Sequence, residues 1–264
     1  MMPADTPPRP RAVKILTYNV HSCIGTDRRL DASRVADAIA ETGADIIGLQ
    51  ELDVGRQRTG GMDQAHAIAS QLRMDAHFHP AMHVKEERYG DAVLTALPMR
   101  LVKAEALPSY GEPRGALWVE IDAFGVELQL INTHLGLWRR ERLKQVETLI
   151  GPDWLGHPDY KNAHRLLIGD FNSIPSSPAY RKLAESIADV QPEVTRHKPT
   201  FPSRYPFFRL DHIFASRGLR CLGADVLKTP LTRIASDHLP LVARFALPDS
   251  PVPETMEQNR EKQG

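Results

Sequence analysis

The sequence lacks a surplus of charge of either sign, a long apolar run and a cysteine framework. Lys+Arg and Asp+Glu number 33 each, so the chain has no overall positive charge that would attract nucleic acid. Non-specific binding to nucleic acid would need a local basic patch. No apolar run approaches the roughly 20 residues that a bilayer-spanning helix needs. The two cysteines, Cys23 and Cys221, are far apart and lack the spacing of a metal site or a disulfide framework. We therefore expect them to be buried thiols.

The composition of the ends differs from that of the middle. Residues 1–11 are rich in proline and have no apolar centre, which indicates a disordered tail rather than a secretory signal or a membrane anchor. Residues 248–264 are polar and contain proline, and we expect a second disordered tail there. The span 12–247 can form one large α/β domain or two small ones, of which we favour one. A soluble, cytoplasmic protein is expected.

A buried strand that ends in polar residues is the most informative stretch. The segment Leu166-Leu167-Ile168-Gly169-Asp170-Phe171-Asn172 begins with consecutive apolar residues, which are typical of a strand covered on both faces. Asp170 and Asn172 have the same parity, so in an extended chain their side chains point to the same side. A carboxylate and an amide at the rim of a rigid strand can hold a water molecule, a metal ion or a phosphate oxygen.

The same pattern recurs along the chain. Further strands are predicted at 12–20, 45–51, 91–97, 100–106, 115–121, 126–133, 210–215, 219–227 and 239–245. Helices are predicted after a cap at Asp31 or Ser33, from Asp63 to about Leu72, from Arg139 to Ile150 and from Ser177-Pro178, where capping residues precede helical patterns. Polar residues at strand ends and in the loops beside them are Asn19, Glu51, Asn132, His134, Asp170, Asn172, Asp211, Asp237 and His238.

Each of these residues also has a structural interpretation. Glu51 could be an exposed loop residue, Asp170 a helix cap, Asn132 a turn former and His134 a core histidine. As a group they favour chemistry, because carboxylate and amide oxygens suit Mg²⁺ or Mn²⁺ rather than zinc. The histidines add proton transfer and hydrogen bonds to an oxyanion.

Six short motifs carry a resemblance to a known superfamily. They are Thr17-Tyr18-Asn19-Val20, Leu49-Gln50-Glu51, Asn132-Thr133-His134-Leu135, Gly169-Asp170-Phe171-Asn172, Leu210-Asp211-His212-Ile213-Phe214 and Ser236-Asp237-His238-Leu239-Pro240. In this order they resemble the endonuclease/exonuclease/phosphatase superfamily, which includes pancreatic-type deoxyribonuclease, exonuclease III-type enzymes, inositol polyphosphate phosphatases and neutral sphingomyelinases. The resemblance implies a four-layer α/β sandwich of two packed mixed β-sheets flanked by helices, with the site at one edge.

The resemblance also implies roles for individual residues. Glu51 would be the principal ligand of Mg²⁺ (or Mn²⁺), with Asn19 beside it and Asp237 completing the set. His238 would contact the phosphoryl group or take a proton, and Asp211 would accept a hydrogen bond from it. These five residues would form the metal and acid-base part of the site.

The remaining catalytic candidates would act on water and phosphate. Asp170 would orient or deprotonate the attacking water, while Asn172 and His134 would hold phosphate oxygens. Whether Asp170 or His238 is the general base stays open at this point. His212 departs from the Asp-Tyr sequence of many members, and we expect a structural role because in a strand it points away from Asp211.

Three residues are candidates for binding the substrate: Arg114, Asn132 and Tyr89. Arg114 could contact a phosphate by bidentate hydrogen bonding, or it could form a plain surface salt bridge. The segments 112–117 and 199–203 resemble a bacterial branch of the superfamily whose substrates are undefined.

These observations predict a Mg²⁺-dependent phosphoesterase that hydrolyses a phosphodiester of a small molecule or a lipid headgroup by metal-assisted in-line attack of water. A DNA or RNA nuclease is the alternative, and it is less favoured because the chain has no long Lys/Arg-rich insertion. A catalytically silent binding module is a third possibility, which the complete set of competent residues disfavours. Specificity would come from loops such as 55–62, 82–88 and 195–209.

Overall fold

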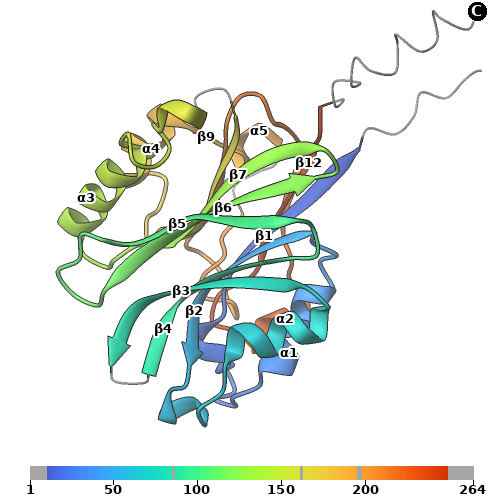
Figure 1. The fold of residues 1–264 in the computed structure, drawn as a ribbon. Helices are drawn as coiled ribbons and strands as arrows, with labels where there is room; N and C mark the ends of the chain where they lie inside the picture. The colour runs from blue at the N-terminus through green and yellow to red at the C-terminus, as the bar shows by residue number, and fades with distance from the viewer. Residues whose placement is uncertain (1–10, 85–86, 161–162, 195–197, 249–264) are drawn as a thin grey trace, which may run out of the picture.

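The protein is a four-layer α/β sandwich, as the sequence predicts. The computed structural model describes residues 11–84, 87–160, 163–194 and 198–248. Two six-stranded mixed sheets pack face to face, and the longer helices cover their outer faces (Figure 1). The predicted tails lie outside the described residues, apart from Arg11 and Pro248.

The first sheet has the strand order β11-β12-β1-β2-β4-β3. Its strands are β1 (Ala12–Asn19), β2 (Ile46–Val54), β3 (Asp75–Val84), β4 (Glu87–Thr95), β11 (Arg220–Val226) and β12 (Leu241–Ala246). Only β1 and β2 run parallel in this sheet, with Asn19 opposite Gln50. Because parallel strands end at the same edge, Asn19 and Glu51 come together there.

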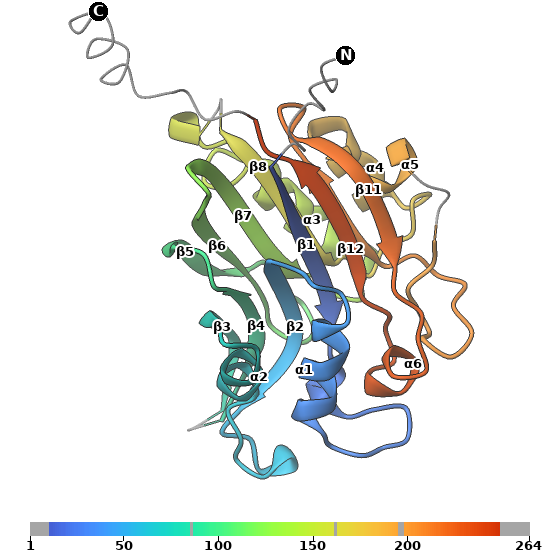
Figure 2. The same ribbon diagram turned by 90° about the vertical axis from the view of Figure 1, so that its right-hand side faces the viewer.

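The second sheet has the order β5-β6-β7-β8-β10-β9. Its strands are β5 (Met99–Leu107), β6 (Arg114–Ala123), β7 (Val126–His134), β8 (His164–Asp170), β9 (Ala188–Asp189) and β10 (Asp211–Ala215). β7 and β8 are parallel and pair His134 with Asp170, whereas antiparallel β10 pairs Asp211 with Asp170. These three residues therefore lie side by side at one edge of the sheet, and Figure 2 shows the neighbouring strands β7 and β8 side by side.

Helices begin where the sequence supplies caps. The α-helices are α1 (Ala32–Ala40), α2 (Gln64–Leu72), α3 (Arg139–Ile150), α4 (Pro178–Ser186), α5 (Gln191–Val194) and α6 (Thr232–Ala235), with 3-10 turns at His21–Cys23, Gln57–Thr59 and Pro158–Tyr160. Asp31, Asp63 and Ser177 each accept a hydrogen bond from the backbone N–H three residues later, which confirms the predicted starts of α1, α2 and α4. Among the described residues, each helix is too short or too polar to cross a membrane.

The sequence analysis missed strand β3. The segment 82–88 was expected to be a loop, but β3 continues to Val84 and β4 begins at Glu87. β3 contains Pro80 at a register shift and pairs only with β4. A proline that cannot donate to the ladder is tolerated at a sheet edge, which explains why the pattern did not suggest a strand. The short elements β9, α5 and α6 were also missed.

The two sheets approach each other closely behind the polar edge. Apolar side chains from both sheets, including Ile15, Ile46 and Ile168, form one fully buried core. At Gly48 on β2, a Cβ atom would lie 2.5 Å from Ile168 Cδ1 and 2.9 Å from Asn132 Oδ1. Glycine at this position therefore permits the close approach of β2 to the second sheet.

Candidate active site

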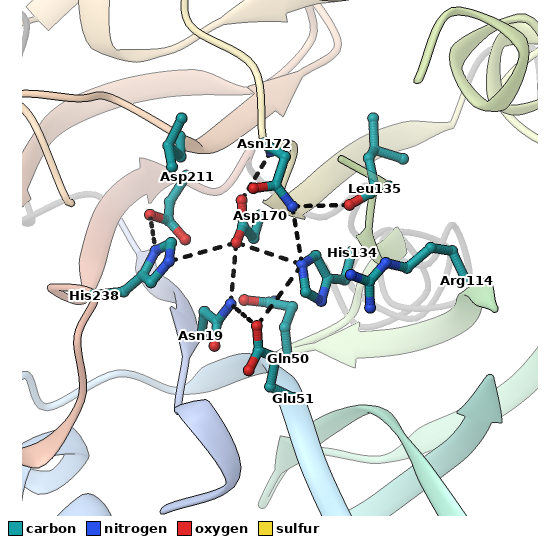
Figure 3. Close-up of polar contacts among 12 residues, drawn as sticks. Asn19, Gln50, Glu51, Arg114, His134, Leu135, Asp170, Asn172, Asp211 and His238 are labelled. Carbon is teal, nitrogen blue, oxygen red and sulfur yellow. Dashed lines mark hydrogen bonds and ion pairs between the residues drawn. The ribbon is translucent and has the colours of Figure 1, made fainter. Parts of the chain in front are cut away.

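Residues from both sheets meet at the edge where β1, β2, β7 and β8 end. The first sheet supplies the predicted residues Asn19 and Glu51 and, from the segment before β12, Asp237 and His238. The second sheet supplies His134, Asp170 and Asp211, and Asn172 follows β8. Figure 3 shows most of these side chains pointing toward one another across the boundary between the sheets.

Asp170 occupies the centre of this group. Its Oδ2 accepts a hydrogen bond of 3.0 Å from Asn19 Nδ2 and lies 3.5 Å from His134 Nε2 and 3.6 Å from His238 Nε2. Its Oδ1 accepts the backbone N–H of Asn172 at 2.8 Å. Burial raises the pKa of Asp170 to about 7, although the nearby His238 opposes the shift. A carboxyl group with such a pKa can exchange a proton near neutral pH.

His238 and Asp211 form a buried pair. His238 Nδ1 donates to Asp211 Oδ2 at 2.8 Å, the contact that the motif series led us to expect, and the Phe201 ring lies 4.8 Å from the imidazole between centroids. Burial alone would lower the pKa of His238, but the carboxylates of Asp211 and Asp170 raise it to about 10. The imidazole is therefore cationic at neutral pH and presents Nε2 to Asp170.

Glu51 adopts an unusual backbone conformation. Its φ of 63° lies in the left-handed region, and the β2–β4 register shifts between Leu49 and Leu52. Such conformations in residues other than glycine cost about 1–3 kcal/mol, and a bulge re-aims a side chain out of the regular pleat. The Glu51 carboxylate, 24% exposed, reaches the site and accepts a hydrogen bond of 2.9 Å from Asn19 Nδ2.

The donor chemistry of the site fits a divalent cation such as Mg²⁺. Glu51 and Asp237 keep side-chain exposures of 24% and 34%, so an ion can reach their oxygens from solvent, and carboxylates are preferred ligands of hard cations. Asp170, Asp211 and His238 also have side-chain oxygen and nitrogen atoms within 4.8 Å of one another, but the cationic His238 donates to Asp211, so this group is not the cation site. Asn19 now presents Nδ2 to the carboxylates while its Oδ1 accepts the His21 N–H at 3.0 Å, so its amide must rotate to act as a ligand.

His134 and Asn172 form the neutral side of the site. Asn172 Nδ2 lies 3.1 Å from His134 Nε2 and donates to the Leu135 carbonyl at 2.9 Å. Burial, reinforced by the charge of Arg114, lowers the pKa of His134 well below its ordinary value. His134 is therefore a neutral imidazole, suited to hydrogen bonding with a phosphate oxygen rather than to charge compensation.

Arg114 and Tyr89 lie beside this group but are largely covered. Arg114 is 6% exposed and forms an ion pair with Glu112, so it is not the plain surface salt bridge that was one alternative. Tyr89 is 5% exposed, and its ring lies 5.8 Å and 5.7 Å from the guanidinium carbons of Arg56 and Arg58. Arg114 lies next to His134 (Figure 3), and a substrate contact by either candidate remains a prediction.

Asn132 lies behind the site rather than in it. It has no exposed surface, and its Nδ2 donates to the carbonyls of Leu49 and Ala92, both at 2.9 Å. Its Oδ1 accepts from Gln50 Nε2 at 2.7 Å. Because its amide is fully engaged in joining the two sheets, we revise its expected role from substrate binding to positioning of β2.

Replacing Asn132 by alanine should therefore destabilise the protein. The change leaves two carbonyls and the Gln50 amide buried without their partner, and each unpaired group costs about 1–3 kcal/mol. We expect the free energy of unfolding, measured by urea denaturation, to fall by about 3 kcal/mol or more. The control is Glu127→Gln, at an exposed position on the same strand, which keeps an oxygen that can accept from Gln129 Nε2, with an expected change within about 0.5 kcal/mol. Equal losses for the two variants would contradict the linking role.

Two residues that the sequence analysis did not select belong to this region. His21 Nδ1 lies 3.0 Å from Asp237 Oδ2. His21 follows Asn19 by two residues at a strand end, and this position could have identified it in the sequence. Asp91 on β4 is 3% exposed, and burial raises its pKa to about 8, with Arg114 opposing the shift. No pattern marked Asp91, because it opens an ordinary apolar strand.

The fold and the site together define a protein of the phosphoesterase type. The Endonuclease/Exonuclease/phosphatase family model matches residues 16–238, and the chain belongs to this family. The chain is 28% identical over 255 residues to the uncharacterized protein YbhP of Escherichia coli K12, covering 89% of this chain and 96% of YbhP.

Solved structures share the fold. An endonuclease/exonuclease/phosphatase from Beutenbergia cavernae has a TM-score of 0.74 and 21% identity, with 92% of this chain and 73% of that chain covered. The mannosyl-6-phosphatase Bt3783 of Bacteroides thetaiotaomicron has a TM-score of 0.71 and 18% identity, with coverages of 89% and 100%. Likeness at this level of identity shows the architecture alone.

Proposed function

We propose that the protein is a Mg²⁺- (or Mn²⁺-) dependent phosphoesterase that hydrolyses a phosphodiester by in-line attack of water. The observation that carries the proposal is the placing of a carboxylate beside a cationic imidazole. Asp170 Oδ2 lies 3.6 Å from His238 Nε2, and His238 Nδ1 lies 2.8 Å from Asp211 Oδ2. Environments that push the pKa values of neighbouring groups apart are typical of acid-base pairs. Membership in the family supports the reaction class.

Glu51, with Asp237 and Asn19, would hold the cation. When bound, the cation neutralises charge on the phosphoryl oxygens and on the leaving oxygen. Asp170 then serves as the general base: its carboxylate, fixed by Asn19 and the Asn172 N–H, orients the attacking water and accepts its proton. We favour Asp170 over His238 as the base, because a cationic imidazole cannot take up another proton.

The other polar groups act on the phosphoryl oxygens. His238, as the cation, stabilises the negative charge that develops in the transition state, and Asp211 keeps its Nε2 aimed at the site. Asn172 Nδ2 and the Nε2 of the neutral His134 lie 3.1 Å apart, and they would exchange this mutual contact for hydrogen bonds to phosphate oxygens. Preorganised donors of this kind contribute most of the stabilisation in many hydrolases.

The pKa values predict a bell-shaped pH profile. The active form has Asp170 deprotonated and His238 protonated, so kcat/KM should rise with pH through about 7 and fall through about 10. Hydrolysis of bis(4-nitrophenyl) phosphate across this range measures both limbs. A profile that is flat from about pH 5 to about pH 8 would contradict the assignment of Asp170 as the base.

Removal of the metal should abolish turnover and lower stability. A cation that binds only the folded state adds about 2.7 kcal/mol at a concentration of 100 times its Kd, so Mg²⁺ should raise the Tm of EDTA-treated protein. Glu51→Gln should remove most of this shift, whereas Glu147→Gln on the exposed face of α3 should keep it. Full activity in EDTA, or an unchanged Mg²⁺ shift in Glu51→Gln, would refute the metal proposal.

A small-molecule or lipid-headgroup diester is the proposed substrate class. The equal numbers of acidic and basic residues provide no overall positive charge for binding a long polyanion, which disfavours the alternative of a nuclease. The test compares glycerophosphodiesters with plasmid and single-stranded RNA under identical Mg²⁺; rapid nicking of plasmid would favour the nuclease. A cytoplasmic location is proposed with this substrate class. Absence of hydrolysis from every substrate would favour a silent binding module.

A further inference from the structure

The exposed apolar side chains are concentrated at the edge that carries the site. Of the twelve large hydrophobic side chains that are exposed in the described part of the chain, all but Leu101 and Phe124 lie in connections at this edge. The four most exposed are Tyr205 (80%), Leu137 (69%), Trp138 (66%) and Phe207 (65%). Phe124 lies at the opposite edge, in the turn between β6 and β7. Such clustering marks an interaction surface rather than scattered surface residues.

One part of this surface, Tyr110, Leu137 and Trp138, adjoins the neutral side of the site. Trp138 precedes α3, and Glu141 accepts hydrogen bonds from the backbone N–H groups of Tyr110 (2.9 Å) and Trp138 (3.4 Å). The Leu135 carbonyl, two residues before Leu137, accepts from the site residue Asn172. The backbone is thus fixed on the second sheet while the three side chains stay exposed.

The other part, Tyr205, Phe207 and Phe208, adjoins His238. Phe208 N–H donates to the Phe201 carbonyl at 2.8 Å, and the Phe207 and Phe208 rings lie 4.2 Å apart between centroids. Ser203 N–H donates to the Asp237 carbonyl at 2.6 Å, which ties this connection to the site. We call the six residues of the two parts the apolar rim.

Basic residues accompany the apolar rim. Arg139 and Arg140 follow Trp138, Arg204 precedes Tyr205, and Arg233 lies on α6 beside the second part. All four are exposed, and none forms an ion pair with another described residue. The nearby carboxylates are engaged, since Glu112 pairs with Arg114 and Glu141 binds backbone groups. Around the site, the surface therefore combines aromatic, aliphatic and cationic side chains.

We propose that the apolar rim docks the protein on the surface of a membrane that contains anionic phospholipids, with the site facing the headgroups. Tryptophan and tyrosine prefer the interface between headgroups and hydrocarbon, and arginines next to them are attracted to anionic lipids. Leu137 offers no π-face to a nucleobase, and an aliphatic side chain favours hydrocarbon over a stacked base. That the docked headgroup is also the substrate rests on the proposed function.

The test is co-sedimentation of the full chain with vesicles of phosphatidylcholine, with and without phosphatidylserine. The rim variants are Leu137→Ala/Trp138→Ala and Tyr205→Ala/Phe207→Ala. The control is Leu101→Ala/Phe124→Ala, which removes apolar side chains that are exposed elsewhere, at 44% and 52%. We expect each rim variant to lose at least about tenfold in affinity for the anionic vesicles, and the control to bind like wild type. Tm and hydrolysis of a water-soluble diester should not change in any of them.

Three outcomes would overturn the docking proposal: no binding of wild type to anionic vesicles, equal losses in rim and control variants, or binding by wild type to a single-stranded oligonucleotide but not to vesicles. Hydrolysis of the water-soluble diester separates this proposal from the proposed function. Turnover without vesicle binding refutes docking alone, whereas vesicle binding without any turnover supports docking and refutes the hydrolase.

Discussion

Asp170→Asn should lower kcat for a phosphodiester by about 10²–10⁴-fold, the contribution typical of a positioned general base. Asparagine has nearly the same shape and can still accept the Asn172 N–H, which donates to Asp170 Oδ1 at 2.8 Å, but its amide cannot take up a proton. The rising limb of the pH profile near 7 should disappear with the base. Steady-state kinetics of bis(4-nitrophenyl) phosphate hydrolysis at saturating Mg²⁺ measure both effects.

The control for this variant is Asp153→Asn, an exposed position outside the site, which should keep wild-type kinetics and pH dependence. Burial raises the pKa of Asp170 to about 7, so the folded state binds this proton more tightly than the unfolded state does. At high pH the buried carboxylate therefore lowers the free energy of unfolding, and its loss removes this destabilising effect. Asp170→Asn should therefore be at least as stable as wild type above pH 7. Wild-type turnover by Asp170→Asn would refute its role as the base.

Asp211→Asn should produce the second large loss, about 10²–10⁴-fold in kcat/KM. Asp211 is fully buried and accepts the Nδ1 hydrogen of His238 at 2.8 Å. Without its charge, the pKa of His238 should fall below about 10, because burial still lowers it and only Asp170 and Asp237 remain to raise it. The imidazole would lose its proton at a lower pH than in the wild type, and the falling limb of the pH profile should move to lower pH with it.

NMR titration of the His238 ring reports this shift directly, independently of turnover. The double variant Asp211→Asn/His238→Asn should be little worse than either single variant, since the pair acts as one unit. Asp225→Asn, at a side chain with 70% exposure, serves as the control. An unchanged pKa of His238 in Asp211→Asn would contradict the argument, as would strictly additive losses.

Much of the site could be predicted because strand ends are visible in a sequence. Apolar runs that stop at Glu51 and Asp170 identify buried strands, and parallel pairing places the ends of neighbouring strands at one edge. The contact of His238 with Asp211 also followed from the motif series. The four-layer sandwich was predictable from the resemblance of the six ordered motifs to a known superfamily, because the resemblance covers nearly the whole chain.

The remainder depends on interactions between residues distant in sequence. The left-handed backbone of Glu51 arises from the bulged pairing of β2 with β4, which no local pattern encodes. Asn132 follows the same strand-end pattern as its neighbours, yet it points between the sheets, where its partners come from β2 and β4. Arg114 and Asp91 are likewise buried because each packs against the facing sheet. Helix and strand propensities of single residues contain no information on packing between sheets.

The close approach of the sheets at Gly48 has a consequence for how this protein can be altered. Half of the site is attached to each sheet, so the spacing between Asn19 and Asp170, joined by a 3.0 Å hydrogen bond, is set by the thickness of the core. A methyl group at Gly48 would press on Ile168 and Asn132, and the catalytic groups would separate with the sheets. We therefore expect loop changes to alter specificity, and substitutions in the interior near Gly48 to alter the rate although they never contact substrate.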